Sequence, residues 1–280
     1  MNNLQISLSQ PTLDKFIKIV LAQFRQESPL TKELVNSNGV KVIGNVQVKS
    51  ITIESLTLKE PNIVDLNKIQ IAFELLNIIV EVDVKRAHDE IKILDLPGKK
   101  YDIAISWDFF KDEPDIRLTF GIEDFFRPSF TASLIWLING RDIAGGLNDF
   151  DVNDFNLADG LGSQIEDRVI SAMKDIIKKK IDNKYLNKVL DYIGDLLKLL
   201  PVDNIGNWII KQITDNQALK QLVEQAVKEN FKPQTLYTAP GQFEFGADLN
   251  KVSISLADSN PIVIAVKDEH LTAWVSFNEL

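Results

Sequence analysis

The stretch Val46–Lys85 reads VQVKSITIESLTLKEPNIVDLNKIQIAFELLNIIVEVDVK, and it decides the fold class. Apolar and polar side chains alternate along it, which is the period of a half-buried β-strand. The alternation changes parity between Val48 and Ile51, returns to the first parity between Ile53 and Leu56, and changes again between Leu75 and Leu76. A strand keeps the same face inward across such a change only where one inserted residue forms a β-bulge.

Two interpretations of these parity changes are open. In the first, long bent strands form one strongly curved antiparallel sheet, because neither Gly nor Pro interrupts Val46–Lys59 or Ile69–Lys85. In the second, several short strands are separated by turns. We expect the curved sheet, and alternating segments further along the chain extend it to Trp136.

Helical periodicity predicts helices on both sides of this region. Pro11 opens a first helix whose apolar stripe contains Leu13, Phe16, Ile17, Val20 and Phe24. The longest helical pattern runs over 161–200, with an apolar residue at every fourth position. Since the helical period is 3.6, this stripe winds around the axis, so the helix is either covered on several sides or broken near Asp182. Shorter helices and further strands follow, and this order predicts an α+β fold with antiparallel strands.

Three stretches carry a family resemblance. They are ISLSQPTLDKFIKIVLAQF (Ile6–Phe24), the quoted stretch Val46–Lys85, and LGSQIEDRVISAMKDIIKKKIDNKYLNKVLDYI (Leu161–Ile193). Their order resembles the TULIP superfamily of tubular lipid-binding proteins, in particular the bactericidal/permeability-increasing protein domain. It is also similar to bacterial TULIP-like proteins of clostridial neurotoxin gene clusters, which are cysteine-poor as well.

The resemblance implies an α+β fold in which long helices are wrapped by a strongly curved antiparallel β-sheet. Residues 1–280 are then a single elongated TULIP-like domain with a helical insertion at about 201–232. In this arrangement we expect Leu161–Ile193 to lie in the concavity of a Val40–Trp136 sheet.

The composition excludes several classes of function. Lys and Arg total 31 against 40 Asp and Glu, so the net charge is −9, whereas a nucleic-acid-binding domain normally carries a basic surface. The chain has no Cys and only two His, at positions 88 and 270, which excludes thiol nucleophiles and Cys zinc sites. We expect both histidines to lie in surface turns.

Motif searches point away from catalysis. Gly145 and Gly146 stand outside any phosphate-loop motif, and the acidic run Asp149–Asp154 fails the EF-hand template because its sixth position is not Gly. Carboxylate pairs such as Asp112 and Glu113 fall in polar turns. We therefore expect a protein that is not an enzyme and uses no metal or cofactor.

The expected function is the binding, and in one version the transfer, of a lipid or other elongated hydrophobic ligand in an apolar channel. The expected channel lining is Phe73, Leu75, Ile78, Trp107, Phe109, Ile165, Val169, Met173 and Ile177. For each of these residues, plain core packing is the competing interpretation. The alternative function is a non-enzymatic structural or interaction protein of a bacterial complex, such as a toxin-associated accessory component, with a filled core.

A basic segment suggests a membrane contact. Lys178, Lys179 and Lys180 follow one another on the predicted long helix, and such clusters attract anionic lipid head groups, although a solvated helix face is the alternative. The sequence begins without a basic segment followed by an apolar one, and its apolar runs are too short to span a bilayer. We expect a soluble protein, either cytoplasmic or secreted without a standard signal peptide.

Overall fold

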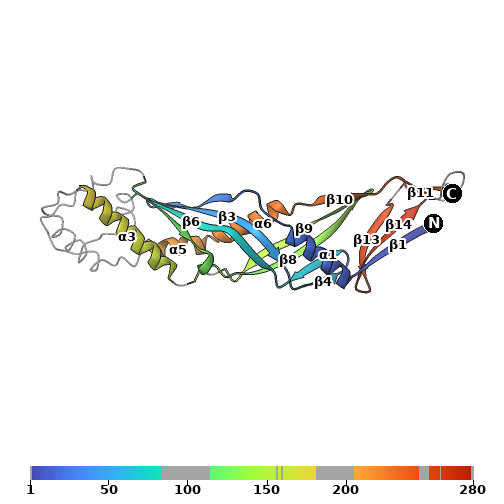
Figure 1. The fold of residues 1–280 in the computed structure, drawn as a ribbon, viewed down its shortest axis with the longest axis horizontal. Coiled ribbons are helices and arrows are strands. Elements are labelled where there is room, and N and C mark those ends of the chain that lie inside the picture. The colour runs from blue at the N-terminus through green and yellow to red at the C-terminus, as the bar shows by residue number, and fades with distance from the viewer. Residues whose placement is uncertain are drawn as a thin grey trace.

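Antiparallel strands make up most of the described chain. The computed structural model describes residues 2–83, 114–155, 157–158, 160–180, 205–245, 252–258 and 260–278. The molecule is elongated, with helix α3 (Leu161–Lys180) toward one end and strand β1 (Asn2–Ser9) toward the other (Figure 1). Between them the strands form several separate sheets.

A four-stranded sheet has the order β2-β3-β6-β7. Its strands are β2 (Leu30–Ser37), β3 (Val40–Thr52), β6 (Gln70–Val82) and β7 (Ile116–Gly121). Every second residue of the two central strands faces the core, as the alternating sequence predicts. The buried residues of this face include Val40, Val42, Val46, Leu76, Ile78 and Val80.

The parity changes beside Val48 and Leu75 correspond to register shifts that face each other across the β3–β6 pair. Gln47 pairs with Leu75 and Val48 pairs with Phe73, so Glu74 of β6 is left out of the register. The next pair joins Ser50 to Ala72, so Lys49 of β3 is left out as well. Each strand therefore carries one extra residue, and the two insertions compensate. Both strands keep their apolar side chains toward the core on either side of the bulges.

A five-stranded sheet has the order β10-β9-β8-β5-β4. Its strands are β4 (Ser55–Lys59), β5 (Ile63–Asn67), β8 (Ser129–Asn139), β9 (Asp142–Asn153) and β10 (Gln234–Thr238). The chain leaves the four-stranded sheet after Thr52 and enters this one at Ser55. The expected single sheet therefore divides at Ile53 and Glu54, although no Gly or Pro marks the position.

Strands from both ends of the sequence form a three-stranded sheet, in the order β1-β14-β13. Strand β13 spans Ile262–Lys267 and β14 spans His270–Phe277. A hairpin of β11 (Gln242–Phe245) and β12 (Val252–Ser255) lies near it. A small second core of Ala239, Leu256 and Ile262 lies in this part of the molecule.

Helix α6 (Ala218–Asn230) occupies the space between the four- and five-stranded sheets, because it contacts β2, β3 and β9. Leu219, Leu222, Val223 and Ala226 lie on one face of this helix and are completely buried, so that face packs into the core. Helix α1 (Gln10–Ala22) contacts β3 and β4. The range expected as an insertion, 201–232, thus contains a central core helix.

The predicted fold class is wrong in one main respect: long helices wrapped by a single curved sheet are not what the described residues form. Several sheets are present, strand exceeds helix, and the longest described helix, α3, has 20 residues. Helix α3 contacts β7 and α5 (Ile205–Asp215) instead of lying in a sheet concavity. The physical reason is that α5 and β7 cover the apolar stripe of α3, while α6 fills the space between the sheets. Residues 181–193 of the expected helix lie outside the described residues.

Candidate functional site

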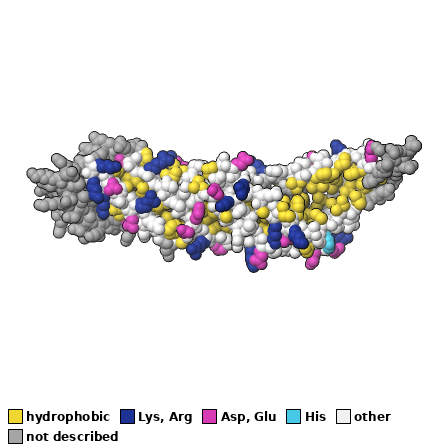
Figure 2. Space-filling model, viewed as in Figure 1, with side chains coloured by type: hydrophobic (Ala, Val, Ile, Leu, Met, Phe, Trp, Pro, Cys, Tyr) yellow, Lys and Arg dark blue, Asp and Glu magenta, His cyan; other side chains and the backbone are white. Residues whose placement is uncertain are grey.

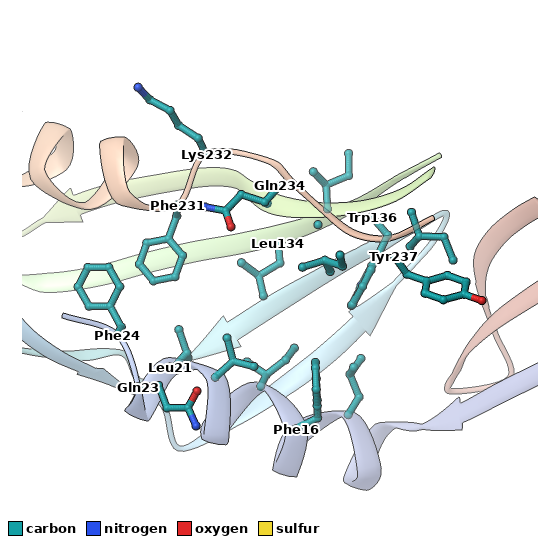
Figure 3. A pocket seen from close by; sticks show the side chains of 18 of the residues that line it. Phe16, Leu21, Gln23, Phe24, Leu134, Trp136, Phe231, Lys232, Gln234 and Tyr237 are labelled. Carbon is teal, nitrogen blue, oxygen red and sulfur yellow. The ribbon is translucent and has the colours of Figure 1, made fainter. Parts of the chain in front are cut away.

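An apolar groove of about 640 Å³ lies between α1, the strands β8 and β9, and the chain that leads from α6 into β10 (Figure 3). Three segments that are distant in sequence therefore build it. The residues that line it are Leu8, Leu13, Phe16, Ile17, Val20, Leu21, Gln23, Phe24, Leu134, Ile135, Trp136, Ile143, Gly145, Gly146, Asn230, Phe231, Lys232, Gln234, Leu236 and Tyr237.

Helix α1 forms one wall of the groove, because only part of its apolar stripe packs against the core and the rest stays accessible. Leu13, Ile17 and Leu21 are buried, as expected for the centre of the stripe. Phe16 and Val20 lie on its flank and are 53% and 47% exposed. Large apolar side chains that remain accessible along a groove are available to contact a ligand.

Strand β8 contributes the floor. Leu134 and Trp136 are two residues apart, so both point to the same side of the strand. Trp136 pairs with Gly145 of β9, and the missing side chain there lets the indole ring lie close to the β9 backbone. The buried Nε1 of Trp136 has no hydrogen-bond partner among the described residues. A ligand oxygen that reached this nitrogen would supply the missing hydrogen bond.

Gly146 sets how closely the chain after α6 approaches β9. A Cβ atom at Gly146 would lie 2.7 Å from Cα of Pro233, and one at Gly145 would lie 2.9 Å from Cδ1 of Leu236. Both distances are shorter than carbon atoms tolerate, so only glycine fits at this crossing without displacement. The two glycines that match no phosphate-binding motif therefore have a packing role at the groove.

An aromatic stack closes one end of the groove. The rings of Phe24 and Phe231 lie 4.7 Å apart at an interplanar angle of 13°. Phe24 lies just after α1 and Phe231 follows α6, so the stack packs the C-terminal ends of these two helices against each other. Leu236 and Tyr237 form the rim toward the other end, where both are more than half exposed. The groove is therefore elongated, with one closed and one open end.

The amide and charged side chains of the lining are few, and they lie near the aromatic stack. Gln23, Asn230, Lys232 and Gln234 belong to the lining, and Asn230 donates a hydrogen bond from Nδ2 to the carbonyl oxygen of Ala226 at 2.7 Å. Lys232 is the only charged side chain among the described residues that line the groove. Figure 3 shows it at the rim, extending away from the apolar interior.

The apolar surface continues beyond the groove. Leu8 belongs to the lining, and Leu4 and Ile6 on the same side of β1 are also exposed. In Figure 2 hydrophobic side chains gather in a hollow over α1, β10 and β13, whereas charged side chains are scattered over the other half of this face. The groove is thus part of a larger apolar area.

The predicted channel residues lie elsewhere, and the described ones are absent from the groove lining. Phe73 is half-buried and packs against Phe126 at a ring distance of 6.2 Å, Leu75 is half-buried, and Ile78 is buried in the four-stranded sheet. Ile165, Val169 and Met173 are buried along α3. Trp107, Phe109 and the side chain of Ile177 lie outside the described residues.

The predicted head-group contact lies at the end of α3. Lys178 and Lys179 are exposed there, and Nζ of Lys178 lies 3.9 Å from Oδ1 of Asp175. The side chain of Lys180 lies outside the described residues. Figure 1 places α3 toward the opposite end of the molecule from α1, so these lysines are remote from the groove.

Most groove residues were visible in the sequence only as members of apolar stripes. Phe16 and Val20 belong to the predicted stripe of the first helix, and Trp136 belongs to a predicted strand. A stripe that faces a groove has the same spacing as one that faces a core. The two kinds of stripe differ in how exposed their side chains are to solvent, and that exposure depends on where β10 and Phe231 lie.

The remaining candidates for chemistry have structural surroundings. His270 is the exposed first residue of β14, where its Nδ1 lies 2.6 Å from the carbonyl oxygen of Asp268 in the preceding turn, and His88 lies outside the described residues. In the acidic run, Asp151 pairs with Lys220, and Asp154 accepts a hydrogen bond from Ser129. The described part of the chain brings together no group of three side chains suited to hold a metal ion.

Comparison with protein-family models, curated proteins and solved structures found no match to this chain. None of the described helices combines the length and the apolar character that crossing a membrane requires. The groove therefore has to be interpreted from its own geometry and chemistry.

Proposed function

We propose that this protein binds the hydrocarbon chain of a lipid, or another elongated apolar molecule, in the groove beside α1. The observation that carries the proposal is an accessible volume of about 640 Å³ with an almost entirely apolar wall. Ligand sites typically have about 300–1,000 Å³ and a few polar groups on a hydrophobic surface. The resemblance of three sequence stretches to tubular lipid-binding proteins suggests the same ligand class.

The energetics favour a long, flexible hydrocarbon chain. Burial contributes about 0.8 kcal/mol for each CH₂ group, so complete burial of about 16 groups would contribute at most about 13 kcal/mol. Loss of translational and rotational freedom costs about 5 kcal/mol or more. The remainder, about 8 kcal/mol, corresponds to micromolar affinity. Phe16 and Val20 would lose their exposure to water at the same time.

The arrangement of polar groups suggests the orientation of the ligand. Lys232 and the amides of Gln23 and Gln234 lie near the closed end, and the opposite rim is formed by Leu236 and Tyr237. An ammonium group favours a carboxylate or phosphate nearby. We infer that an acidic head group lies near Lys232 and that the chain extends past Trp136 toward Tyr237.

The decisive experiment places a charge in the groove. Val20→Glu puts a carboxylate on the groove wall, where its desolvation opposes burial of an apolar chain. We expect the variant to bind a fluorescent 16-carbon fatty acid at least about tenfold more weakly, a loss of about 1.4 kcal/mol. The measurement is a fluorescence titration at constant salt.

Ile19→Glu is the matched control. Ile19 is the neighbouring residue of the same helix and is 60% exposed, but it does not belong to the groove lining. The net charge changes equally in both variants, so a general electrostatic effect would weaken binding equally. Equal effects in the two variants, or absence of binding by the parent protein, would contradict the proposal.

A second function, protein interaction, is favoured by a separate observation. Strand β1, an outer strand of its sheet among the described residues, carries exposed Leu4 and Ile6 next to the groove, and exposed apolar patches of this kind mark interaction surfaces. This edge leads to the more specific inference below.

A further inference from the structure

Strand β1 is an outer strand of the three-stranded sheet that the described residues form, and its outer side is called its free edge below. On one side it pairs with β14 along its whole length, from Asn2 with Phe277 to Ser9 with His270. No strand of the described chain pairs with its other side, and Figure 1 shows β1 along the outer margin of the three-stranded sheet. The opposite outer strand, β13, is different because it contacts β8.

The edge lacks the usual protection against strand pairing. Natural edge strands carry charged residues, prolines or bulges that prevent another strand from adding to them. Asn2–Ser9 contains no charged residue and no proline, and its pairing with β14 shows no register shift. Leu4, Ile6 and Leu8 point to one side of the strand and are 49%, 52% and 41% exposed.

We propose that the free edge of β1 pairs in antiparallel orientation with the β1 edge of a second copy of this chain. Two three-stranded sheets would then join into one six-stranded sheet across a two-fold axis. This is the isologous contact typical of homodimers, in which the same surface is used by both subunits.

The direction of the backbone groups defines the register. The N–H of Gln10 donates to the carbonyl oxygen of Glu269, which continues the β1–β14 register by one residue. Backbone groups alternate in direction along a strand, so even-numbered residues of β1 direct theirs toward β14. Asn3, Gln5, Ser7 and Ser9 therefore direct their N–H and C=O groups outward, toward a second copy.

A two-fold axis at Ile6 satisfies these outward groups. Gln5 then forms a hydrogen-bonded pair with the partner's Ser7, and Asn3 does so with the partner's Ser9. On the apolar side, Leu4 lies opposite the partner's Leu8, and Ile6 lies opposite the partner's Ile6. Apolar side chains meet apolar ones and polar side chains meet polar ones, without any pair of like charges. The strand is thus complementary to itself, which favours a second copy over an unrelated partner.

The first test is the oligomeric state of the full chain as a function of concentration. Sedimentation equilibrium of the parent protein up to about 100 µM should show a monomer–dimer equilibrium. Ile6→Lys places two ammonium groups opposite each other at the axis and should raise the dimer Kd at least about tenfold. Val263→Lys is the control, because Val263 is 49% exposed on β13 of the same sheet but away from the β1 edge.

The second test uses the absence of native cysteine. Directly opposed residues in a non-hydrogen-bonded pair have Cβ atoms about 4.5 Å apart, close to the separation in a disulfide. Ile6→Cys should therefore form a covalent dimer under mild oxidation, and Val263→Cys should not. A monomeric parent protein, a dimer that Ile6→Lys leaves intact, or equal crosslinking of both cysteine variants would overturn the proposal.

These outcomes are separate from those for the groove. Ile6 does not line the groove, so Ile6→Lys should retain fatty-acid binding while it loses dimerisation. Val20→Glu should show the reverse behaviour. Failure of either proposal therefore leaves the other one testable in the same protein preparations.

Discussion

Gln26 is a polar side chain in the core, only 8% exposed, and it supports the backbone beside the β3 bulge. Its Oε1 accepts a hydrogen bond from the N–H of Val48 at 2.9 Å, and its Nε2 donates to the carbonyl oxygen of Ser28 at 2.7 Å. Val48 is the residue at which the β3–β6 register shifts. One side chain thus provides a hydrogen bond to the strand at its irregular point.

Gln26→Leu should destabilise the protein by about 1–3 kcal/mol, because it leaves the N–H of Val48 without a partner in the core. Chemical denaturation of both proteins measures the difference. Gln70→Leu, an exposed substitution on β6, is the control and should change the free energy of unfolding little. A Gln26→Leu variant as stable as this control would show that water or a rearranged backbone replaces the side chain.

At the scale of elements, two contacts between a helix and its neighbour are specific enough to test. Helices α3 and α5 cross at a pair of glycines, Gly162 and Gly206, and a Cβ atom at Gly206 would collide with the carbonyl group of Gly162. Arg168 also fixes α3 against β7, since its Nη1 donates to the carbonyl oxygen of Thr119 at 2.9 Å. Its guanidinium group lies 4.5 Å from the ring centre of Phe120.

Gly206→Ala should separate α3 from α5 and lower the stability by about 1–3 kcal/mol, since the obstacle is backbone and cannot rotate away. Thermal unfolding followed by circular dichroism would show a lower Tm. Gly121→Ala, on β7, is the matched control because no atom lies within 4 Å of its added Cβ. Equal Tm values for the two variants would mean that the helices do not cross as described.

Helix α6 is joined to β9 by an ion pair. Nζ of Lys220 lies 2.8 Å from Oδ1 of Asp151, and the hydrogen bond from Lys220 holds the pKa of Asp151 below its usual range. A carboxylate with a lowered pKa stabilises the folded state above its ordinary pKa of about 4. That contribution is lost as the pH falls through the lower folded-state pKa.

Asp151→Asn should therefore flatten the loss of stability below about pH 4, while making the protein less stable than the parent at neutral pH. Thermal unfolding measured at a series of pH values tests both parts. Asp149→Asn removes the same charge from β9 but not this ion pair, so it should keep the acid dependence of the parent. Parallel pH profiles for the parent and Asp151→Asn would contradict the assignment.

At the scale of the whole molecule, the alternation of side chains predicted strands and bulges, but not the sheets to which the strands belong. The parity changes beside Val48 and Leu75 were visible because each side chain must face either core or solvent. The division of the sheet coincides with a parity change between Ile53 and Leu56, but a bulge inside one strand produces the same change, so the alternation does not distinguish the two. The groove escaped prediction for a similar reason, since Val20 faces either core or groove with the same helical spacing.

The pairing of β1 with β14 has a consequence for the order in which the chain folds. Asn2 pairs with Phe277, so almost the entire sequence lies between the two strands of this ladder. Contacts of such long sequence separation form late, because closing a long loop costs conformational entropy before the strand pairing can compensate for it. Until β14 is available, the uncharged segment Asn2–Ser9 lacks the one described strand that pairs with it, and unpaired strands of this kind aggregate readily. A chain that stops before His270 should therefore depend on chaperones to stay dispersed, even though both of its larger sheets can form.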